Sequence, residues 1–135
     1  MTKRPVRALV IAACLALGGA PALAAGLFVI ANSDVALSAD DVKEVYLGEK
    51  QFAGPVRLAP VDNAMAQADF LKRAITIEAV KYSSIWTKKG FREGLNPPAV
   101  KSGDLEVIEF VKRTPGAVGY VTTPPGSGVN LIVKY

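Results

Sequence analysis

The sequence predicts an α/β fold built as a single domain. Three observations indicate it: a continuous apolar run at Leu27–Ala31, helix-forming segments that alternate with apolar ones through the middle of the chain, and the short apolar segment Ala117–Val121 directly after a Pro-Gly turn. Alternation of strands and helices is typical of α/β domains, and fully apolar strands are typical of sheets covered on both faces. Residues 25–135 have the length of one ordinary domain.

The first 24 residues have the pattern of a secretory signal peptide. Three cations among the first seven residues precede the apolar run Ala8–Leu17, and Ala22–Ala24 offers small residues at the spacing of a cleavage site. The apolar run is short for a membrane span. We therefore expect an exported, periplasmic protein that is cleaved near Ala24-Ala25, with residues 25–135 as the mature domain.

Cysteine and histidine usage limits the chemistry of the chain. Cys14 is the only cysteine, and there is no histidine. The mature domain can therefore form no disulfide, and it lacks the most common general base and metal ligand. We expect no enzyme activity, no metal and no cofactor. Ile11–Cys14 also resembles a lipobox, so lipidation of Cys14 stays open beside its interpretation as one more apolar residue of the signal.

Charge argues against nucleic acid as a partner. The net charge of +4 falls to +1 when the cations of residues 1–24 are removed. The remaining charge is uneven, because residues 25–71 hold three basic and seven acidic residues whereas residues 72–113 hold nine and five. The basic segment is compatible with a surface for an anion or an acidic partner. Charges that alternate on solvated helix faces are the favoured explanation.

The first half of the domain reads as strand, helix, strand, helix. After Leu27–Ala31, Ser38–Asp41 matches a helix N-terminus, and the helix should end near Gly48. Val56–Val61 is typical of a second strand. Asp62-Asn63 can cap a second helix over Ala64–Ala74.

The second half continues the alternation. Thr76 should cap a helix over Ile77–Lys88, with Val80 and Trp86 among its core positions, and Gly90–Pro98 should form a loop. Ser102 should cap a last helix that ends at Arg113, because Pro115 cannot continue it, and Leu105 should face the core. Strands follow at Ala117–Val121 and Val129–Val133. Gly119 should let a helix lie close to the sheet.

Several motifs recur in an order and spacing that point to one family. They are V-K-E-V-Y-L-G-E at 42–49, V-R-L-A-P-V-D at 56–62, Trp86 followed by Phe91 and Asn96-Pro97-Pro98, and T-P-G-A-V-G-Y-V at 114–121. Together they resemble the periplasmic solute-binding proteins of phosphate ABC transporters. The resemblance implies a PBP-like domain: one lobe of a type II periplasmic-binding-protein fold, with a central, mostly parallel sheet flanked by helices.

The chain departs from that family at the phosphate motif. Family members that bind phosphate have Ser-Gly-Thr where Ala64-Met65-Ala66 stands here. The basic residue that precedes this segment most closely in the sequence is Arg57. Backbone N–H groups at Asn63–Ala66 remain as a candidate anion site, which gives Asp62, Asn63, Ala64, Met65 and Ala66 as ligand-binding candidates. Asp62 would repel an anion if it pointed inward, and Asp62 or Asn63 as a simple helix cap stays open.

Two functions are compatible with these residues. The first is a non-catalytic, solute-binding-like domain that binds a small, phosphate-like anion weakly or in an altered way. The alternative is an interaction or assembly module that acts with a membrane sensor or transporter, or with a second copy, and takes no small ligand. Thr122-Thr123 and Asn32-Ser33 are further candidates, since they should follow the carboxyl ends of strands, where open α/β sheets bind ligands.

Overall fold

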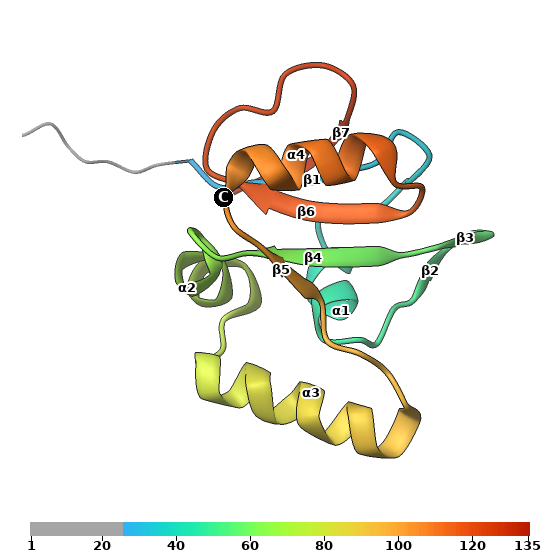
Figure 1. The fold of residues 1–135 in the computed structure, drawn as a ribbon, viewed down its shortest axis with the longest axis vertical. Helices are drawn as coiled ribbons and strands as arrows, with labels where there is room; N and C mark the ends of the chain where they lie inside the picture. Colours follow the sequence, from blue (N-terminus) through green and yellow to red (C-terminus); the bar gives the residue numbers. More distant parts are fainter. Residues whose placement is uncertain (1–25) are drawn as a thin grey trace, which may run out of the picture.

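The structure, a computed structural model, describes residues 26–135 and contains a five-stranded sheet (Figure 1). The order across the sheet is β5 (Ala99–Lys101), β4 (Ala59–Asn63), β6 (Ala117–Val121), β1 (Phe28–Ala31) and β7 (Asn130–Lys134). β4 pairs in parallel with β5 and β6, while β1 pairs antiparallel with β6 and β7. Four strands therefore run the same way and β1 opposes them. This confirms the α/β fold with a mostly parallel sheet.

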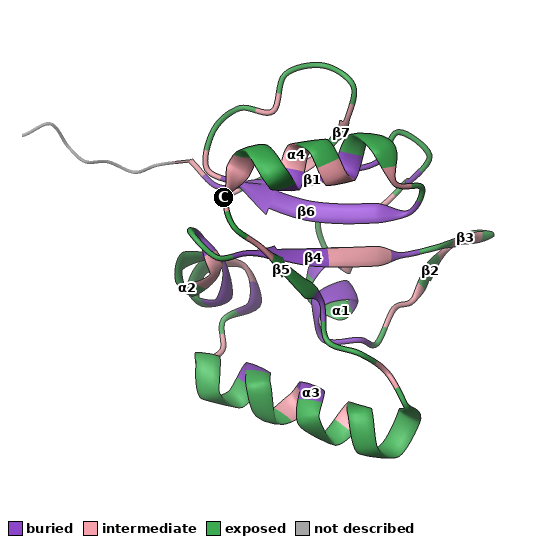
Figure 2. Cartoon of the chain, in the orientation of Figure 1, coloured by how far each residue is buried: buried purple, intermediate pink, exposed green. Residues whose placement is uncertain are grey.

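Helices cover both faces of this sheet. α4 (Asp104–Arg113) packs on one face, and α1 (Asp41–Tyr46), α2 (Gln67–Phe70), η1 (Leu71–Ile75) and α3 (Ala79–Glu93) lie on the other (Figure 1). Because successive residues of a strand point to opposite faces, β1 sends Val29 and Ala31 toward α1, and Phe28 and Ile30 toward α4. The central strands β1 and β6 are buried throughout (Figure 2).

Gly119 has the predicted packing role. A Cβ atom at this position would lie 2.5 Å from Cγ1 of Val107 and 3.2 Å from Cγ2 of Val111, both on α4. The missing side chain therefore lets α4 approach β6 closely, as expected from the sequence.

Two predicted boundaries were wrong in the middle of the chain. Val56–Val61 is divided, because β3 (Val56–Arg57) pairs back onto β2 (Phe52–Ala53) around Gly54, whose φ is +61°, and the sheet strand β4 begins at Ala59. α3 continues through Gly90 to Glu93, where a loop was expected. The strand β5 was missed altogether, since three residues after two prolines carry little strand pattern.

Helix caps and core faces also differ from the predictions. Gly103 precedes α4 in place of Ser102, and Thr76 ends η1 with a φ of 61° rather than capping α3. Val80 is 82% exposed and Leu105 is 72% exposed. The buried positions of the two helices are Tyr82 and Trp86 on α3 and Val107 and Val111 on α4, which confirms the core position predicted for Trp86.

The predicted signal peptide and the lipidation of Cys14 lie outside the described residues. Within residues 26–135, no helix is both long enough and apolar enough to span a membrane.

Candidate functional site

Strand β4 sends its last two side chains to opposite faces of the sheet. Asp62 points toward α3, where it meets Tyr82, and Asn63 points toward α4, where it meets Asp104. Both residues lie at the carboxyl end of β4, which is the edge where parallel α/β sheets commonly bind ligands. The sequence-predicted candidates therefore divide between two separate environments.

Asp62 is a buried carboxyl group held by two tyrosines. It is 1% exposed; the hydroxyl of Tyr120 donates to Oδ1 at 2.7 Å and the hydroxyl of Tyr82 donates to Oδ2 at 2.9 Å. Burial raises the pKa of Asp62 above its ordinary value of 3.8, although the hydrogen bonds from Tyr120, Tyr82 and Gln67 act in the opposite direction. Burial also raises the pKa of both tyrosine hydroxyls, so they remain donors at neutral pH.

A groove of about 590 Å³ lies over Asp62, between α3 and the segment that leads into β5. We call it the Asp62 groove. Its lining consists of Asp62, Gln67, Tyr82, Ser83, Trp86, Thr87, Gly90, Phe91, Leu95, Asn96, Pro97, Pro98 and Val100. The floor thus carries one carboxyl group and the walls are mainly aromatic and apolar, which is the composition of many small-molecule sites.

Asn63 belongs to a polar cluster on the other face. Its Nδ2 donates to Oδ1 of Asp104 at 2.8 Å, and the backbone N–H of Thr122 donates to the same carboxylate at 3.1 Å. The hydroxyls of Thr122 and Thr123 donate to Oδ2 of Asp104 at 2.6 and 3.3 Å. Burial alone would raise the pKa of Asp104, but these hydrogen bonds outweigh it and hold the pKa below its ordinary value.

The expectation of free N–H groups at Asn63–Ala66 was wrong for the three residues after Asn63. Ala64 N–H donates to the carbonyl of Lys101 at 2.8 Å, Met65 N–H donates to Oδ1 of Asn63 at 3.0 Å, and Ala66 N–H donates to the carbonyl of Asn63 at 3.0 Å. Ala66 itself precedes α2, with no side-chain cap from Asp62 or Asn63. The turn after β4 is therefore closed by its own hydrogen bonds and presents no row of donors to an anion.

The two further candidates, Thr122-Thr123 and Asn32-Ser33, do not lie together, because β1 runs antiparallel to β6. Thr122-Thr123 does follow the carboxyl end of β6, where it binds Asp104. Asn32 follows β1, which is antiparallel, and its N–H bonds the carbonyl of Ala117 at the start of β6. Asn32-Ser33 and Thr122-Thr123 consequently lie at opposite ends of the neighbouring strands β1 and β6.

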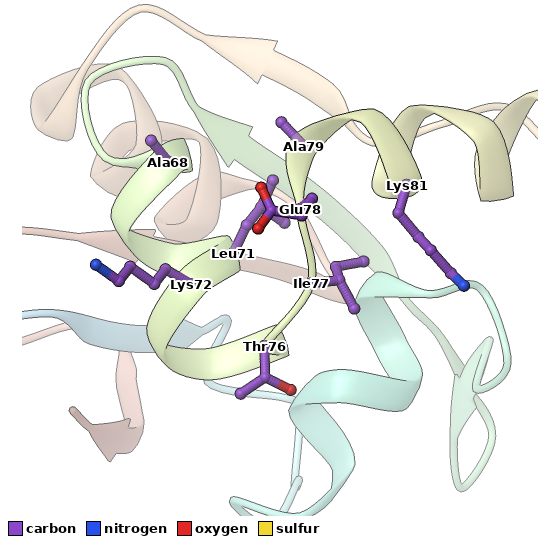
Figure 3. A pocket seen from close by; sticks show the side chains of 8 residues that line it. All are labelled: Ala68, Leu71, Lys72, Thr76, Ile77, Glu78, Ala79 and Lys81. Atoms are coloured by element: carbon purple, nitrogen blue, oxygen red, sulfur yellow. The ribbon is translucent and has the colours of Figure 1, made fainter.

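A second hollow lies between η1 and the start of α3. Its volume is about 800 Å³, and Lys72, Glu78 and Lys81 are among its lining residues. Figure 3 shows Lys72 and Lys81 extending on opposite sides of the hollow, with Glu78 between them. Its charged groups do not converge on one point, so the Asp62 groove is the better candidate site.

Sequence reasoning placed Trp86 at a core position, but it missed Tyr82 and did not place Phe91 on the same helix. Tyr82 and Trp86 are four residues apart on α3 and thus share a helix face, which was available as a signal. Phe91 was placed in a loop because two prolines follow a few residues later. Within the described residues, no group of three His, Cys, Asp or Glu side chains is arranged to hold a metal ion.

Among known proteins, the chain is similar to several solved structures. No family model matches the chain, and no curated protein matches it. PstS from Borrelia burgdorferi is 15% identical, with a TM-score of 0.48, over 71% of this chain and 40% of that one. An ABC-type phosphate transport receptor from Vibrio cholerae is 15% identical, with a TM-score of 0.48, over 79% of this chain and 45% of that one.

A third similar structure is assigned as a phosphate ABC transporter substrate-binding protein, with bound phosphate, from Clostridium perfringens. It is 13% identical, with a TM-score of 0.49, over 79% of this chain and 44% of that one. The chain thus spans less than half the length of each of the three structures that it is similar to.

Proposed function

We propose that the chain is a non-catalytic, solute-binding domain that holds its ligand in the Asp62 groove. The observation that carries this proposal is a groove of about 590 Å³ that is lined by the buried carboxyl group of Asp62 and by the aromatic side chains of Tyr82, Trp86 and Phe91. Small-molecule sites combine a largely apolar lining with a few fixed polar groups. Tyr120 and Tyr82 fix the carboxyl group of Asp62 in this way.

Phosphate is the anion to test first, and we propose that it binds weakly. Two of the three similar structures are described as phosphate transport or phosphate-binding proteins, and the sequence motifs resemble the same family. The N–H groups of Ala64, Met65 and Ala66 are already used within the chain. The hydroxyls of Thr122 and Thr123 already donate to the carboxylate of Asp104. This internal anion occupies the donors that a bound phosphate would need.

Export remains part of this proposal. The cations, apolar run and small residues of the first 24 residues support secretion and cleavage near Ala24-Ala25, with a lipid on Cys14 as the alternative. The mass of the protein recovered from the producing cells distinguishes the two, because cleavage removes Cys14 whereas lipidation keeps it and adds acyl chains.

An interaction module is the second candidate, and the exposed apolar side chains around β5 favour it. Met65 and Phe91 are exposed, as is Val100 on β5 itself. β5 is an edge strand whose outer side has no neighbour among the described strands. A second copy of the chain or a membrane protein partner would cover these side chains.

Thermal unfolding with added ligands, at two protein concentrations, tests the two candidates against each other. A solute-binding domain should show a saturable rise in melting temperature, which corresponds to about 2.7 kcal/mol at a ligand concentration of 100 times Kd. An assembly module should instead melt at a higher temperature when the protein concentration is raised, and small solutes should have no effect. A melting temperature that responds to neither change would contradict both proposals.

A further inference from the structure

We propose that the Asp62 groove selects organic cations, specifically a primary ammonium group carried on an apolar body. This inference rests on the proposed function and names the class of ligand that the groove prefers over the weakly bound phosphate. It follows from the charge of the groove, from the hydrogen bonds at its floor and from its aromatic walls.

The charge of the lining residues is one-sided. Asp62 is an acid, and none of the described residues that line the groove is a lysine or an arginine. A phosphate or carboxylate ligand would therefore find no opposite charge in the groove and would be repelled by Asp62. A cation would instead provide the counter-charge that a buried carboxylate otherwise lacks.

The floor can accept hydrogen bonds from such a cation. The hydroxyl of Tyr82 donates its proton to Oδ2 of Asp62, so the Tyr82 oxygen can act as an acceptor toward a donor in the groove. Tyr82 itself lines the groove, together with Asp62. An ammonium group has three donors and no acceptor, which suits a floor made of one hydroxyl oxygen and one carboxylate.

The walls suit both the charge and the body of this ligand. Tyr82, Trp86 and Phe91 all come from α3 and line the groove. Aromatic faces attract cations, and their rings offer apolar contact area to the rest of the ligand. Phe91 is 87% exposed, so its ring is not committed to the protein core and can pack on a ligand.

Three probes with one body and different head groups test the choice of charge. They are 2-phenylethylammonium, 2-phenylethanol and 3-phenylpropionate, titrated calorimetrically into the purified protein at neutral pH. We expect the ammonium to bind about tenfold more tightly than the alcohol, a factor that corresponds to about 1.4 kcal/mol. The carboxylate should bind more weakly than the alcohol.

Paired variants locate the interaction. Asp62→Asn should remove the preference for ammonium over alcohol, while Asp40→Asn, the same change at an exposed position, should keep it. Phe91→Ala should weaken the binding of all probes several-fold. Val80→Ala, which truncates an exposed side chain on the same helix outside the groove, should not.

The outcomes separate this inference from the proposed function. If the alcohol or the carboxylate binds as tightly as the ammonium, with both weakened by Phe91→Ala, the groove binds solutes but the preference for cations is wrong. If Asp62→Asn does not fold, the head-group series and Phe91→Ala still decide the question. If none of the probes binds, the inference fails, and the proposed function then depends on the wider thermal screen.

Discussion

The hydroxyl of Tyr120 donates a hydrogen bond of 2.7 Å to Oδ1 of Asp62, and so joins β6 to β4 through their side chains. The ring of Tyr120 also stacks on Phe70, with ring centroids 3.8 Å apart and planes within 6°. Tyr120 on β6 thus contacts both the carboxyl group of Asp62 and the ring of Phe70 on α2. The position of Asp62 at the floor of the groove depends on this arrangement.

Tyr120→Phe should destabilise the fold while leaving the stacked ring in place. The variant removes a buried hydrogen bond to a carboxyl group, for which we expect a loss of about 1.5–3 kcal/mol in the free energy of unfolding. Urea denaturation measures this loss. Tyr135→Phe is the matched control, because the Tyr135 hydroxyl donates no hydrogen bond to any of residues 26–135. Equal stability of Tyr120→Phe and the control would show that the bond to Asp62 contributes nothing.

The raised pKa of Asp62 predicts an unusual pH dependence. Burial raises this pKa above the ordinary value of 3.8, so the folded protein holds a proton that the unfolded chain has already released. Between these two pKa values, the free energy of unfolding therefore decreases as the pH rises. Asp104 acts in the opposite direction, because its lowered pKa stabilises the fold until the pH falls through that value.

Comparison with Asp62→Asn isolates the contribution of Asp62 to this dependence. The stability advantage of the wild type over the variant should be greatest in acid and should shrink as the pH rises toward neutrality. Denaturation series of both proteins across this pH range provide the measurement. A wild-type advantage that grew with pH would mean that the carboxylate, and not the carboxylic acid, is the favoured form in the fold.

Gly119→Ala should overpack the interface between β6 and α4. The added Cβ would lie 2.5 Å from Cγ1 of Val107, so the helix must shift, and we expect a loss of about 1–3 kcal/mol. Gly90→Ala is the control within a helix, where the nearest atom to an added Cβ is 3.5 Å away and alanine should be neutral or stabilising. Unchanged melting of Gly119→Ala would contradict the close approach of α4.

Asp104→Ala should create an anion site where the chain now supplies its own carboxylate. The donors of Asn63, Thr122 and Thr123 would lose their acceptor, and the melting temperature should fall. Added formate or phosphate should then restore part of the loss in the variant and have little effect on the wild type. Equal anion effects in both proteins would show that these donors do not form a site.

Much of the fold could be predicted from the sequence because the strong apolar patterns are local. β1 and β6 are buried on both faces, which appears in the sequence as continuous apolar runs. β5 could not be found in this way, because its three residues form a strand only by pairing with β4. Val80 and Leu105 were assigned to the core since apolar residues usually face it, but each lies on the solvent side of its helix.

The candidate site was predicted in part. Asp62 was among the candidates, but only the alternation of β4 shows that it points toward Tyr82 while Asn63 points toward Asp104. The hydrogen bonds that use the N–H groups of Ala64 and Ala66 depend on Lys101 and on the local turn. Such partners are distant in the sequence or set by turn geometry, so a motif comparison did not reveal them.

Fluorescence of Trp86 tests the central claim most directly, because Trp86 is the only tryptophan in the chain and lines the Asp62 groove. The protein is titrated with a panel of small amines, alcohols, carboxylates and phosphate, and Phe91→Ala is titrated in parallel. A solute-binding groove predicts a saturable change in emission for at least one solute, with weaker binding to Phe91→Ala. Emission that no solute changes, or an identical response of both proteins, would contradict ligand binding in this groove.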